Sequence, residues 1–509
     1  MKEIEERPIT EETLDPQHWQ EMRQLGHRML DDMMDFLENI RDEPTWQPVP
    51  DSVQDSFKSG VPKRGVGIET AYRDFKETIL PYPMGNVHPK FWGWALGTGT
   101  PFSMLAEMLA AGMNSNLGGG DHAANYVESQ VLDWSKEMLG FPRSASGLLV
   151  SGASMANLIG LTVARNQKAG YDVRAEGVRN EQSRLFIYAS AEGHSSVQKA
   201  VELLGLGRLS LRNVPVNNHF QMDISALRRM IREDRADGHH PICLIGSAGT
   251  INTGAFDDLA KQAEIARQED LWFHVDGAFG ALAALSPALS HLIAGMEEAD
   301  SLAFDFHKWM YMPYEAGCIL VKNAEEHHRS FSLNPEYLAH IEGGIASGGS
   351  WFHEYGLQLS RQFRALKIWM SLKEHGLEKF RRMVEQNCRQ GQHLAGLINQ
   401  EKSLALLAPV PLNIVCFRFL DDDLNTTELN ALNQEILIEL QESGTAVPSH
   451  TMINGKFAIR PAFFNHRTKM ADIDDFVSAV LKIGRRKRKK AQAEDLRSSP
   501  EPTHSPRQN

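Results

Sequence analysis

The chain of 509 residues lacks long apolar runs and has few cysteines. No run reaches about 18 apolar residues, which predicts no membrane-spanning helix and no membrane partner. The acidic first residues, MKEIEERPITEETLDPQHWQ, contain no apolar signal core, which argues against secretion. The four cysteines have neither paired nor metal-type spacing, so we expect a reducing, cytoplasmic location, no disulfides and no metal site.

Positive charge is also scarce, since the formal net charge is −12. This balance argues against nucleic acid as the main partner. A single basic block, GRRKRKKAQ, starts at Gly484 and precedes a segment rich in charge, serine and proline. A polyanion-binding or nuclear signal is one reading of it. We favour a solvated, disordered tail over residues 485–509, because almost nothing apolar is available for burial.

The remaining pattern predicts an α/β protein of several domains, with 42% hydrophobic residues. Amphipathic helical stretches and proline-rich connections make up an N-terminal segment, 1–100. Short apolar runs (GLLVS, RLFIYAS, PICLIGS, LWFHVD) then alternate with helical periodicity, which predicts a mostly parallel sheet buried on both faces. We place this large domain at 101–385 and a small C-terminal α/β domain at 386–484.

Ligands of such sheets bind beyond the carboxyl ends of the strands, so the residues after each apolar run are informative. After GLLVS, the residues Gly152, Ala153 and Ser154 open a helical stretch whose free N–H groups can hold a phosphate. Taken alone, a capped turn explains this motif better. After RLFIYAS comes His194, whose ring can stack on a planar ligand or make a local hydrogen bond.

Three further positions carry stronger chemistry. After PICLIGS, Thr250 lies in a tight turn rich in hydroxyl groups. Asp276 ends LWFHVD and is followed by residues too small to shield it, so its carboxylate needs a cation. Lys308 lies in the apolar run SLAFDFHKW, where an amine is rarely buried unless it is paired or chemically modified.

One cofactor explains these positions together. Pyridoxal phosphate needs a phosphate cup, a stacking partner, an acid that keeps its ring nitrogen protonated, and a lysine that holds it as a Schiff base. A buried Asp276 serves the ring nitrogen by ion pairing. We therefore predict Lys308 as the Schiff-base lysine. The alternative is a lysine whose stem merely covers apolar surface.

The motifs SGASMAN, GHSSVQKA, HVDGAFGA and FDFHKW resemble those of the pyridoxal-phosphate-dependent group II amino acid decarboxylases. This resemblance extends from about residue 82 to about residue 475. It implies a type I (aspartate-aminotransferase-like) fold and a homodimer with its active sites at the subunit interface, the N-terminal segment packing on the partner. It also implies roles for single residues: Ala153 and Ser154 on the phosphate, His194 and Ala278 against the ring, Asp276 on the ring nitrogen, His307 beside Lys308, Thr250 near the cofactor, and Arg460 on a substrate carboxylate.

The sequence departs from the family pattern at three places. Phe306 replaces the usual proline before His-Lys, and Ile251 replaces a common threonine. In the loop that normally carries a proton-donating tyrosine, an ungapped count places Phe352 at that position, and relatives with phenylalanine there tend to yield an aldehyde. Tyr355 lies three residues further on, and His353 is another possible donor.

We predict decarboxylation of an L-amino acid to an amine, a step of amino acid and carboxylic acid metabolism. Oxidative deamination to an aldehyde on the same fold is the alternative, and an aminotransferase or another lyase ranks third. A non-catalytic protein that kept the fold belongs to a different class, and no G-x-G-x-x-G motif supports a dinucleotide site. Phe91, Trp92 and Trp94 are candidates for lining an aromatic-substrate pocket, although large aromatic residues more often serve packing. Thr98 and Thr100 nearby suit a polar substrate equally well. Of the two, we favour an aromatic substrate.

Overall fold

The computed structural model describes residues 11–179, 183–333, 343–347 and 350–498. The chain divides into two compact units. The first comprises the chain up to Glu43 and Val49–Pro83, and the second comprises Pro44–Pro48 and the chain from Met84 onward. Residues 84–100, which we assigned to the N-terminal segment, therefore group with the second unit.

The first unit is helical, as its amphipathic pattern predicted. It consists of α1 (Trp19–Glu38), α2 (Asp51–Ser56), α3 (Ile68–Asp74) and a π-helical turn, η1 (Phe75–Ile79). The side chains of Tyr72 and Lys76 donate hydrogen bonds of 2.5 and 2.9 Å to the Asp32 carboxylate and so fasten α3 and η1 to α1.

The second unit contains two sheets. The elements of its first part are β1 (Phe91–Trp92), α4 (Pro101–Met113), α5 (Ala123–Met138), β2 (Ser146–Val150), α6 (Ala153–Lys168), α7 (Val173–Glu176), β3 (Leu185–Ser190), α8 (Ser195–Leu203), β4 (Leu211–Val214), α9 (Ile224–Ala236), β5 (His240–Ser247), α10 (Leu259–Gln268), β6 (Trp272–Asp276), β7 (Ser301–Asp305), α11 (Phe306–Trp309), β8 (Gly317–Val321) and α12 (Ala324–Phe331). The elements of its last part are η7 (Phe352–Tyr355), α13 (Ala365–Gln400), β9 (Leu404–Leu406), β10 (Phe417–Phe419), α14 (Thr426–Glu442), β11 (Val447–Ile453), β12 (Lys456–Arg460) and α15 (Met470–Ser498).

The seven-stranded sheet has the order β2-β8-β7-β6-β5-β3-β4. The neighbours from β7 to β4 are parallel, which confirms the largely parallel sheet. β8 runs antiparallel to both β7 and β2, because the connection from Asp305 to Gly317 holds only the short α11 and is too short for a crossover. β2 then has the direction of β7, so the carboxyl ends of all strands except β8 meet at one edge.

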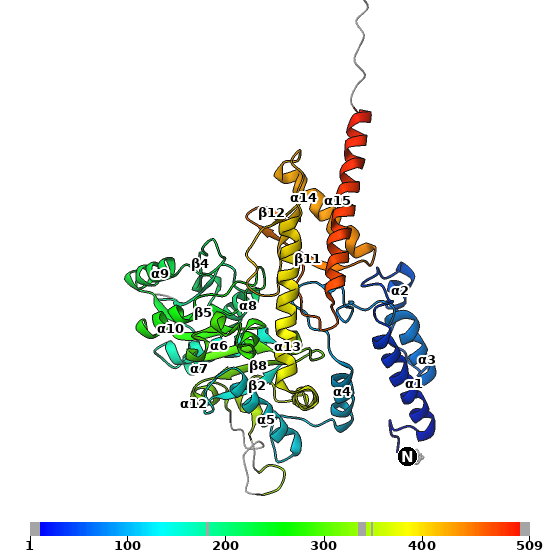
Figure 1. Ribbon diagram of the computed structural model, residues 1–509. Coiled ribbons are helices and arrows are strands. Elements are labelled where there is room, and N and C mark those ends of the chain that lie inside the picture. The colour runs from blue at the N-terminus through cyan, green and yellow to red at the C-terminus, as the bar shows by residue number, and fades with distance from the viewer. Residues whose placement is uncertain (1–10, 180–182, 334–342, 348–349, 499–509) are drawn as a thin grey trace, which may run out of the picture. The chain divides into compact units, whose positions relative to one another are not determined.

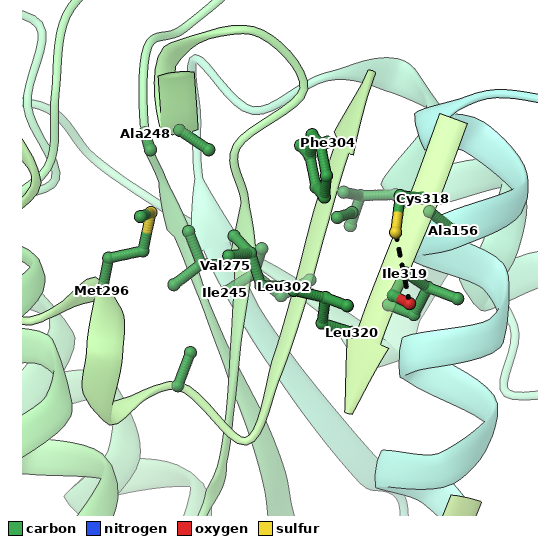
Figure 2. Close-up of a cluster of buried hydrophobic side chains, with 14 of the residues drawn as sticks. Ala156, Ile245, Ala248, Val275, Met296, Leu302, Phe304, Cys318, Ile319 and Leu320 are labelled. Carbon is green, nitrogen blue, oxygen red and sulfur yellow. Dashed lines mark hydrogen bonds between the residues drawn. The ribbon is translucent and has the colours of Figure 1, made fainter. Parts of the chain in front are cut away.

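Helices cover both faces of this sheet. The first layer contains α6, α8 and α12, and the second contains α9 and α10. Since successive strand residues point to opposite faces, His274 of β6 faces α6 whereas Phe273 lies on the α10 side. Figure 2 shows Ile245 of β5, Val275 of β6 and Leu302 of β7; Val275 and Leu302 are register partners on one face of the sheet, and Ile245 is the register partner of His274 on the other. All three apolar side chains are buried, each contributing roughly 1.5–3 kcal/mol of hydrophobic stabilisation.

The five-stranded sheet, in the order β1-β11-β12-β10-β9, forms the C-terminal part with α14 and α15. The long helix α13, yellow in Figure 1, contacts α4 and α5 near the first sheet and α15 and β9 near the second. It changes direction at Gly376, whose φ of 66° is a conformation that glycine adopts at little cost. α13 thus joins the two sheets within one unit.

The basic block differs from the predicted disordered tail. α15 continues through it to Ser498, and residues 499–509 lie outside the described part of the chain. Successive basic side chains pair with acidic residues of the C-terminal part: Arg485 with Glu401, Arg486 with Glu439, Lys487 with Glu435, and Arg488 with Asp421. These partners are distant in sequence, so composition alone did not reveal them.

Candidate active site

A cavity of about 840 Å³ lies at the carboxyl edge of the seven-stranded sheet. It collects residues that follow β2, β3, β6 and β7, which is the edge where the sequence analysis placed the ligand. The predicted residues among its lining are Ala153, Ser154, His194, Asp276, Ala278, His307 and Lys308. Asp305, Tyr314 and Glu315 also line the cavity, and we had assigned no role to them.

Lys308 lies in α11, directly after β7 ends at Asp305. Its Nζ is 3.1 Å from Oδ2 of Asp305, and Nε2 of His307 is 3.5 Å from the same oxygen. His307 accepts the backbone N–H of Ala316 at Nδ1, so Nε2 carries the ring proton of the neutral form. Burial lowers the pKa of His307. The lysine is therefore paired, and its amine remains at the cavity wall.

The segment before α4, which contains Gly97, packs against the backbone that follows β7. A Cβ atom on Gly97 would collide with the backbone carbonyl of His307, so only glycine allows this close approach. The ring of Tyr314 lies 4.6 Å from the ring of His307, measured between centroids. These contacts fix the backbone on both sides of Lys308.

Asp276 ends β6 and is buried. Its Oδ2 accepts a hydrogen bond of 2.9 Å from the side-chain amide of Asn157, and its Oδ1 accepts one of 3.2 Å from the backbone N–H of Ala278. Within the described ranges no basic side chain forms an ion pair with it. The carboxylate therefore lines the cavity with neutral hydrogen-bond donors as its partners.

His194 makes the local hydrogen bond that the sequence allowed, and it also lines the cavity. Its Nδ1 accepts the backbone N–H of Ser196 at 3.2 Å and caps α8, while the ring lines the cavity. Burial lowers the pKa of His194, so the ring is favoured in its neutral form. A neutral, locally anchored ring is suited to stacking on a planar ligand.

The phosphate motif opens α6. The helix starts after Gly152 with no side-chain cap. The Gly152 carbonyl accepts the N–H of Met155 at 2.9 Å, and the first two residues of the helix, Ala153 and Ser154, line the cavity without a capping side chain. Sixteen residues of helix follow, whose dipole favours an anion at this end.

Thr250 and Thr98 use their hydroxyl groups locally and do not line the cavity. The Thr250 hydroxyl accepts the N–H of Ala255 at 3.1 Å and contacts the Thr253 hydroxyl at 3.2 Å. The Thr98 hydroxyl donates to the neighbouring Gly99 carbonyl at 3.1 Å. Both side chains stabilise the turns that carry them.

Arg460 is buried and also lies outside the cavity lining. Its guanidinium donates to the carbonyls of Ile251, Asn252 and Trp94 and to the Ser449 hydroxyl. Burial lowers the pKa of Arg460 to about 10. In this chain Arg460 fastens the five-stranded sheet to the turn after β5.

The three aromatic residues proposed as substrate contacts differ in how far they are buried. Phe91 and Trp92 are buried, and Trp92 packs against Phe463 and Phe476. Packing therefore accounts for these two. Trp94 is half exposed and lies outside the cavity lining.

Part of the loop before η7 lies outside the described residues, but Phe352 and Tyr355 are described. Phe352 is buried, with the Arg361 guanidinium 5.1 Å from its ring centroid. Tyr355 packs on His327, with ring centroids 5.1 Å apart, and Nδ1 of His353 donates a 2.9 Å hydrogen bond to the Gly118 carbonyl. None of the three lines the cavity of its own chain.

The chemistry of the cavity fits pyridoxal phosphate. An uncapped helix start suits a phosphate, Asp276 suits a protonated ring nitrogen, and Lys308 offers an amine to an aldehyde. The side chains of Ala153 and Ala278 are small enough to leave room for a ring. In addition, Oδ1 of Asp305 is buried with no hydrogen-bond partner among the described residues, so this wall retains an unused acceptor. The described ranges hold no cluster of metal-ligating side chains.

Comparison with known proteins agrees with this chemistry. The family model for the pyridoxal-dependent decarboxylase conserved domain matches residues 50–420. An aromatic-L-amino-acid decarboxylase of Bacillus atrophaeus is 33% identical over 470 residues, spanning 91% of this chain and 95% of the relative. A phenylacetaldehyde synthase of Petunia hybrida is 29% identical over 488 residues, spanning 91% of this chain and 94% of the relative. The crystal structure of Oryza sativa TDC with PLP and tryptamine has the same fold, with a TM-score of 0.86 at 22% identity, covering 93% of this chain and 99% of that one.

Proposed function

The chain belongs to the pyridoxal-dependent decarboxylase family and takes pyridoxal phosphate as its cofactor, and from this premise we propose that it converts an aromatic L-amino acid to its amine and carbon dioxide. The observation that carries the proposal is the juxtaposition of the Lys308 amine and the Asp276 carboxylate in one cavity. Asp276 ends β6, and Lys308 lies in α11, which directly follows the neighbouring strand β7, so the sheet sets the separation of the two segments.

Each cavity residue has a role in this proposal. Lys308 would hold the cofactor covalently through its side-chain amine. Asp276 holds a proton on the ring nitrogen, and His194 and Ala278 confine the ring from its two sides. The start of α6, at Ala153 and Ser154, binds the phosphate. When bound, the cofactor supplies an electron sink for the pair left on the α-carbon as carbon dioxide departs.

Asp305 and His307 position the amine. The Asp305 carboxylate lies 3.1 Å from Nζ of Lys308, so it gives the released ammonium group a fixed resting place at the cavity wall. His307 is itself anchored by the Ala316 N–H, which keeps its second nitrogen directed at Asp305. Phe306, between them, stands where the family motif usually has proline.

The aromatic substrate rests on the relatives. The Bacillus atrophaeus relative is named for aromatic L-amino acids, and an Oryza sativa relative, 27% identical over 476 residues, is a tryptophan decarboxylase. Tyr314 adds an aromatic surface to the cavity itself. The buried Phe91 and Trp92 contribute nothing to this argument, since both serve packing.

Aldehyde formation is the second candidate, favoured by Phe352 and by the likeness to the Petunia hybrida aldehyde synthase. In that reaction the amino acid, oxygen and water give the aldehyde, carbon dioxide, ammonia and hydrogen peroxide, with oxygen accepting the two electrons. The simple decarboxylation instead places a proton on the α-carbon and uses no oxygen.

We propose further that the protein is a cytoplasmic homodimer. Helix α4 exposes Met108, Leu109 and Met113, an apolar strip that a second copy would cover. All four cysteines are unpaired, in keeping with a reducing compartment. No helix of the described residues is long and apolar enough to cross a membrane. Sedimentation at several protein concentrations tests the dimer, and a monomer at all of them would contradict it.

Product analysis tests the reaction. The purified protein, loaded with pyridoxal phosphate, is incubated in air with separate L-amino acids, and carbon dioxide, amine, aldehyde, ammonia and peroxide are measured. We expect an equimolar amine and carbon dioxide from an aromatic substrate, and no carbon dioxide from Lys308→Ala. Aldehyde with equimolar ammonia and peroxide would establish the second candidate. Turnover of only non-aromatic amino acids would refute the proposed substrate class.

A further inference from the structure

A continuous chain of buried hydrogen bonds runs beneath the cavity and ends on Asp276. The side chains of Trp272, His274 and Asp276 point to the same face of β6, because they alternate along the strand. Ser301 of β7 stands directly opposite His274, and Asn157 of α6 lies above both. The links are Trp272 Nε1 to Ser301 Oγ at 2.8 Å, Ser301 Oγ to His274 Nδ1 at 2.8 Å, His274 Nε2 to Asn157 Oδ1 at 2.9 Å, and Asn157 Nδ2 to Asp276 Oδ2 at 2.9 Å.

The groups at the two ends fix the direction of every bond. The Trp272 indole can only donate, and the ionised Asp276 carboxylate can only accept. Asn157 therefore presents its amide N–H to Asp276 and its carbonyl to His274, which in turn must carry its proton on Nε2. Burial lowers the pKa of His274 to about 4, against the pull of the Asp276 charge, so the ring is neutral and its Nδ1 accepts the Ser301 hydroxyl.

All donors in this chain thus point toward Asp276. Aligned hydrogen bonds polarise one another, so the amide of Asn157 is a stronger donor to the carboxylate than it would be alone. This series of hydrogen bonds brings no positive charge to Asp276. Its dipoles stabilise the carboxylate and leave the negative charge available to a cationic group of a ligand.

Asn157 also serves the other side of the cavity. Its amide nitrogen is 3.1 Å from the Ser196 hydroxyl, which is 2.7 Å from Nδ1 of His194. The Ser196 hydroxyl accepts from Asn157 and donates to His194, whose proton is therefore on Nε2. One buried amide is thus bonded toward both the carboxylate and the ring that face the cavity.

We infer that Asn157 is the positioning residue of the cofactor site: it holds the Asp276 carboxylate aimed at the ring nitrogen, and it sets the orientation of the His194 ring through Ser196. The inference rests on the proposed role of Asp276. Asn157 itself does not line the cavity and acts only through these two side chains.

The test compares two ligands on the full-length protein freed of cofactor. Pyridoxal phosphate is matched with its 1-deaza analogue, in which carbon replaces the ring nitrogen, and both dissociation constants are measured by quenching of tryptophan fluorescence. We expect the wild type to prefer pyridoxal phosphate. Asn157→Leu should reduce this preference by roughly tenfold, the size of one charge-assisted hydrogen bond, while the affinity for the analogue falls by a smaller factor, because the analogue senses only the altered orientation of His194.

The control is Asn433→Leu, which removes an equally buried asparagine from α14 of the C-terminal part. It should leave the ligand preference unchanged. An Asn157→Leu protein that weakens both ligands equally would show a merely structural role and overturn the inference. If the wild type itself has no preference, Asp276 does not act on the ring nitrogen, and the role proposed for Asp276 falls together with this one.

Two measurements remain informative should Asn157→Leu fail to fold. Ser301→Ala removes only the distant hydroxyl donor and should reduce the ligand preference by about threefold, because its effect passes through His274. In the wild type, long-range ¹H–¹⁵N correlation spectra of histidine-labelled protein should give the Nε2–H tautomer for both His274 and His194. An Nδ1–H tautomer of His274 would reverse the chain and overturn the inference.

Discussion

Two buried carboxylates end neighbouring strands of the same sheet, and their surroundings differ in kind. Asp276, at the end of β6, is bonded only to neutral donors, the Asn157 amide at 2.9 Å and the Ala278 N–H at 3.2 Å. Asp305, at the end of β7, lies 3.1 Å from the Lys308 amine and 3.5 Å from the His307 ring. Its other oxygen has no hydrogen-bond partner among the described residues.

The difference teaches how one sheet edge can hold two acids with separate tasks. Neutral donors stabilise a charge without cancelling it, so Asp276 keeps its full attraction for a ligand cation. A cationic neighbour cancels the charge, so Asp305 acts on Lys308 rather than on a ligand. Three changes, taken from the largest expected effect to the smallest, break or sharpen this contrast.

The first change neutralises each acid in turn. Asp276→Asn should lower kcat by about 10³-fold, because the amide cannot hold a proton on the ring nitrogen; this equals about 4 kcal/mol of lost transition-state stabilisation. Asp305→Asn should lower kcat by less than about tenfold, because an amide still accepts a hydrogen bond from the amine. Release of labelled carbon dioxide measures both. Equal losses in the two variants would refute the division of tasks.

The second change probes the neutral histidine beneath Asp276. The pKa of His274 is about 4 in the folded chain against 6.5 ordinarily, so between these values the unfolded chain binds a proton that the native chain does not. The contribution of His274 to stability is complete above pH 6.5 and is lost as the pH falls toward 4. His274→Gln should therefore reduce the slope of unfolding free energy against pH in this window by about 1.4 kcal/mol per unit.

A second buried histidine, distant from Asp276, serves as the matched control for the effect of a neutral histidine on stability. Burial lowers the pKa of His327, on α12, to about 3, so His327→Gln should reduce the slope by a similar amount. Only the His274 variant should also weaken the preference for pyridoxal phosphate over its deaza analogue. Urea unfolding between pH 4 and 7 and the fluorescence titration measure the two effects. If both variants lose this ligand preference, the hydrogen bonds that link His274 to Asp276 are not what sets it.

The sequence predicted the parts of this site that follow strands. Asp276 and Lys308 come directly after apolar runs, and parallel strands bring such positions to one edge whatever their separation in sequence. The same rule located His194 and the start of α6. The local sequence pattern was sufficient for these residues, because the parallel sheet brings the ends of its strands together at one edge.

The residues that support the site were missed for the opposite reason. Asn157 looks like any polar residue of a helix until α6 is seated on β6, and the sequence analysis treated His274 only as part of a strand. A signal was available, since Trp272, His274 and Asp276 alternate on one face of a strand that is otherwise apolar. Arg460 shows the converse error: its residue type fits a carboxylate, but its place in the fold gives it backbone carbonyls.

The last change crowds the α6 side of β6 without removing a polar group. A Cβ atom on Gly160 would lie 2.9 Å from the His274 ring and 3.2 Å from the Ser301 hydroxyl. Gly160→Ala should therefore destabilise the protein by about 1 kcal/mol, since the crowding of about 2 kcal/mol outweighs the better helix propensity of alanine. Gly396→Ala in α13 meets nothing within 4 Å and should stabilise by about 0.5–1 kcal/mol. Urea unfolding midpoints compare the two variants. Stabilisation of both would mean that α6 can move away from β6 freely, and a helix that loose could not hold Asn157 on Asp276.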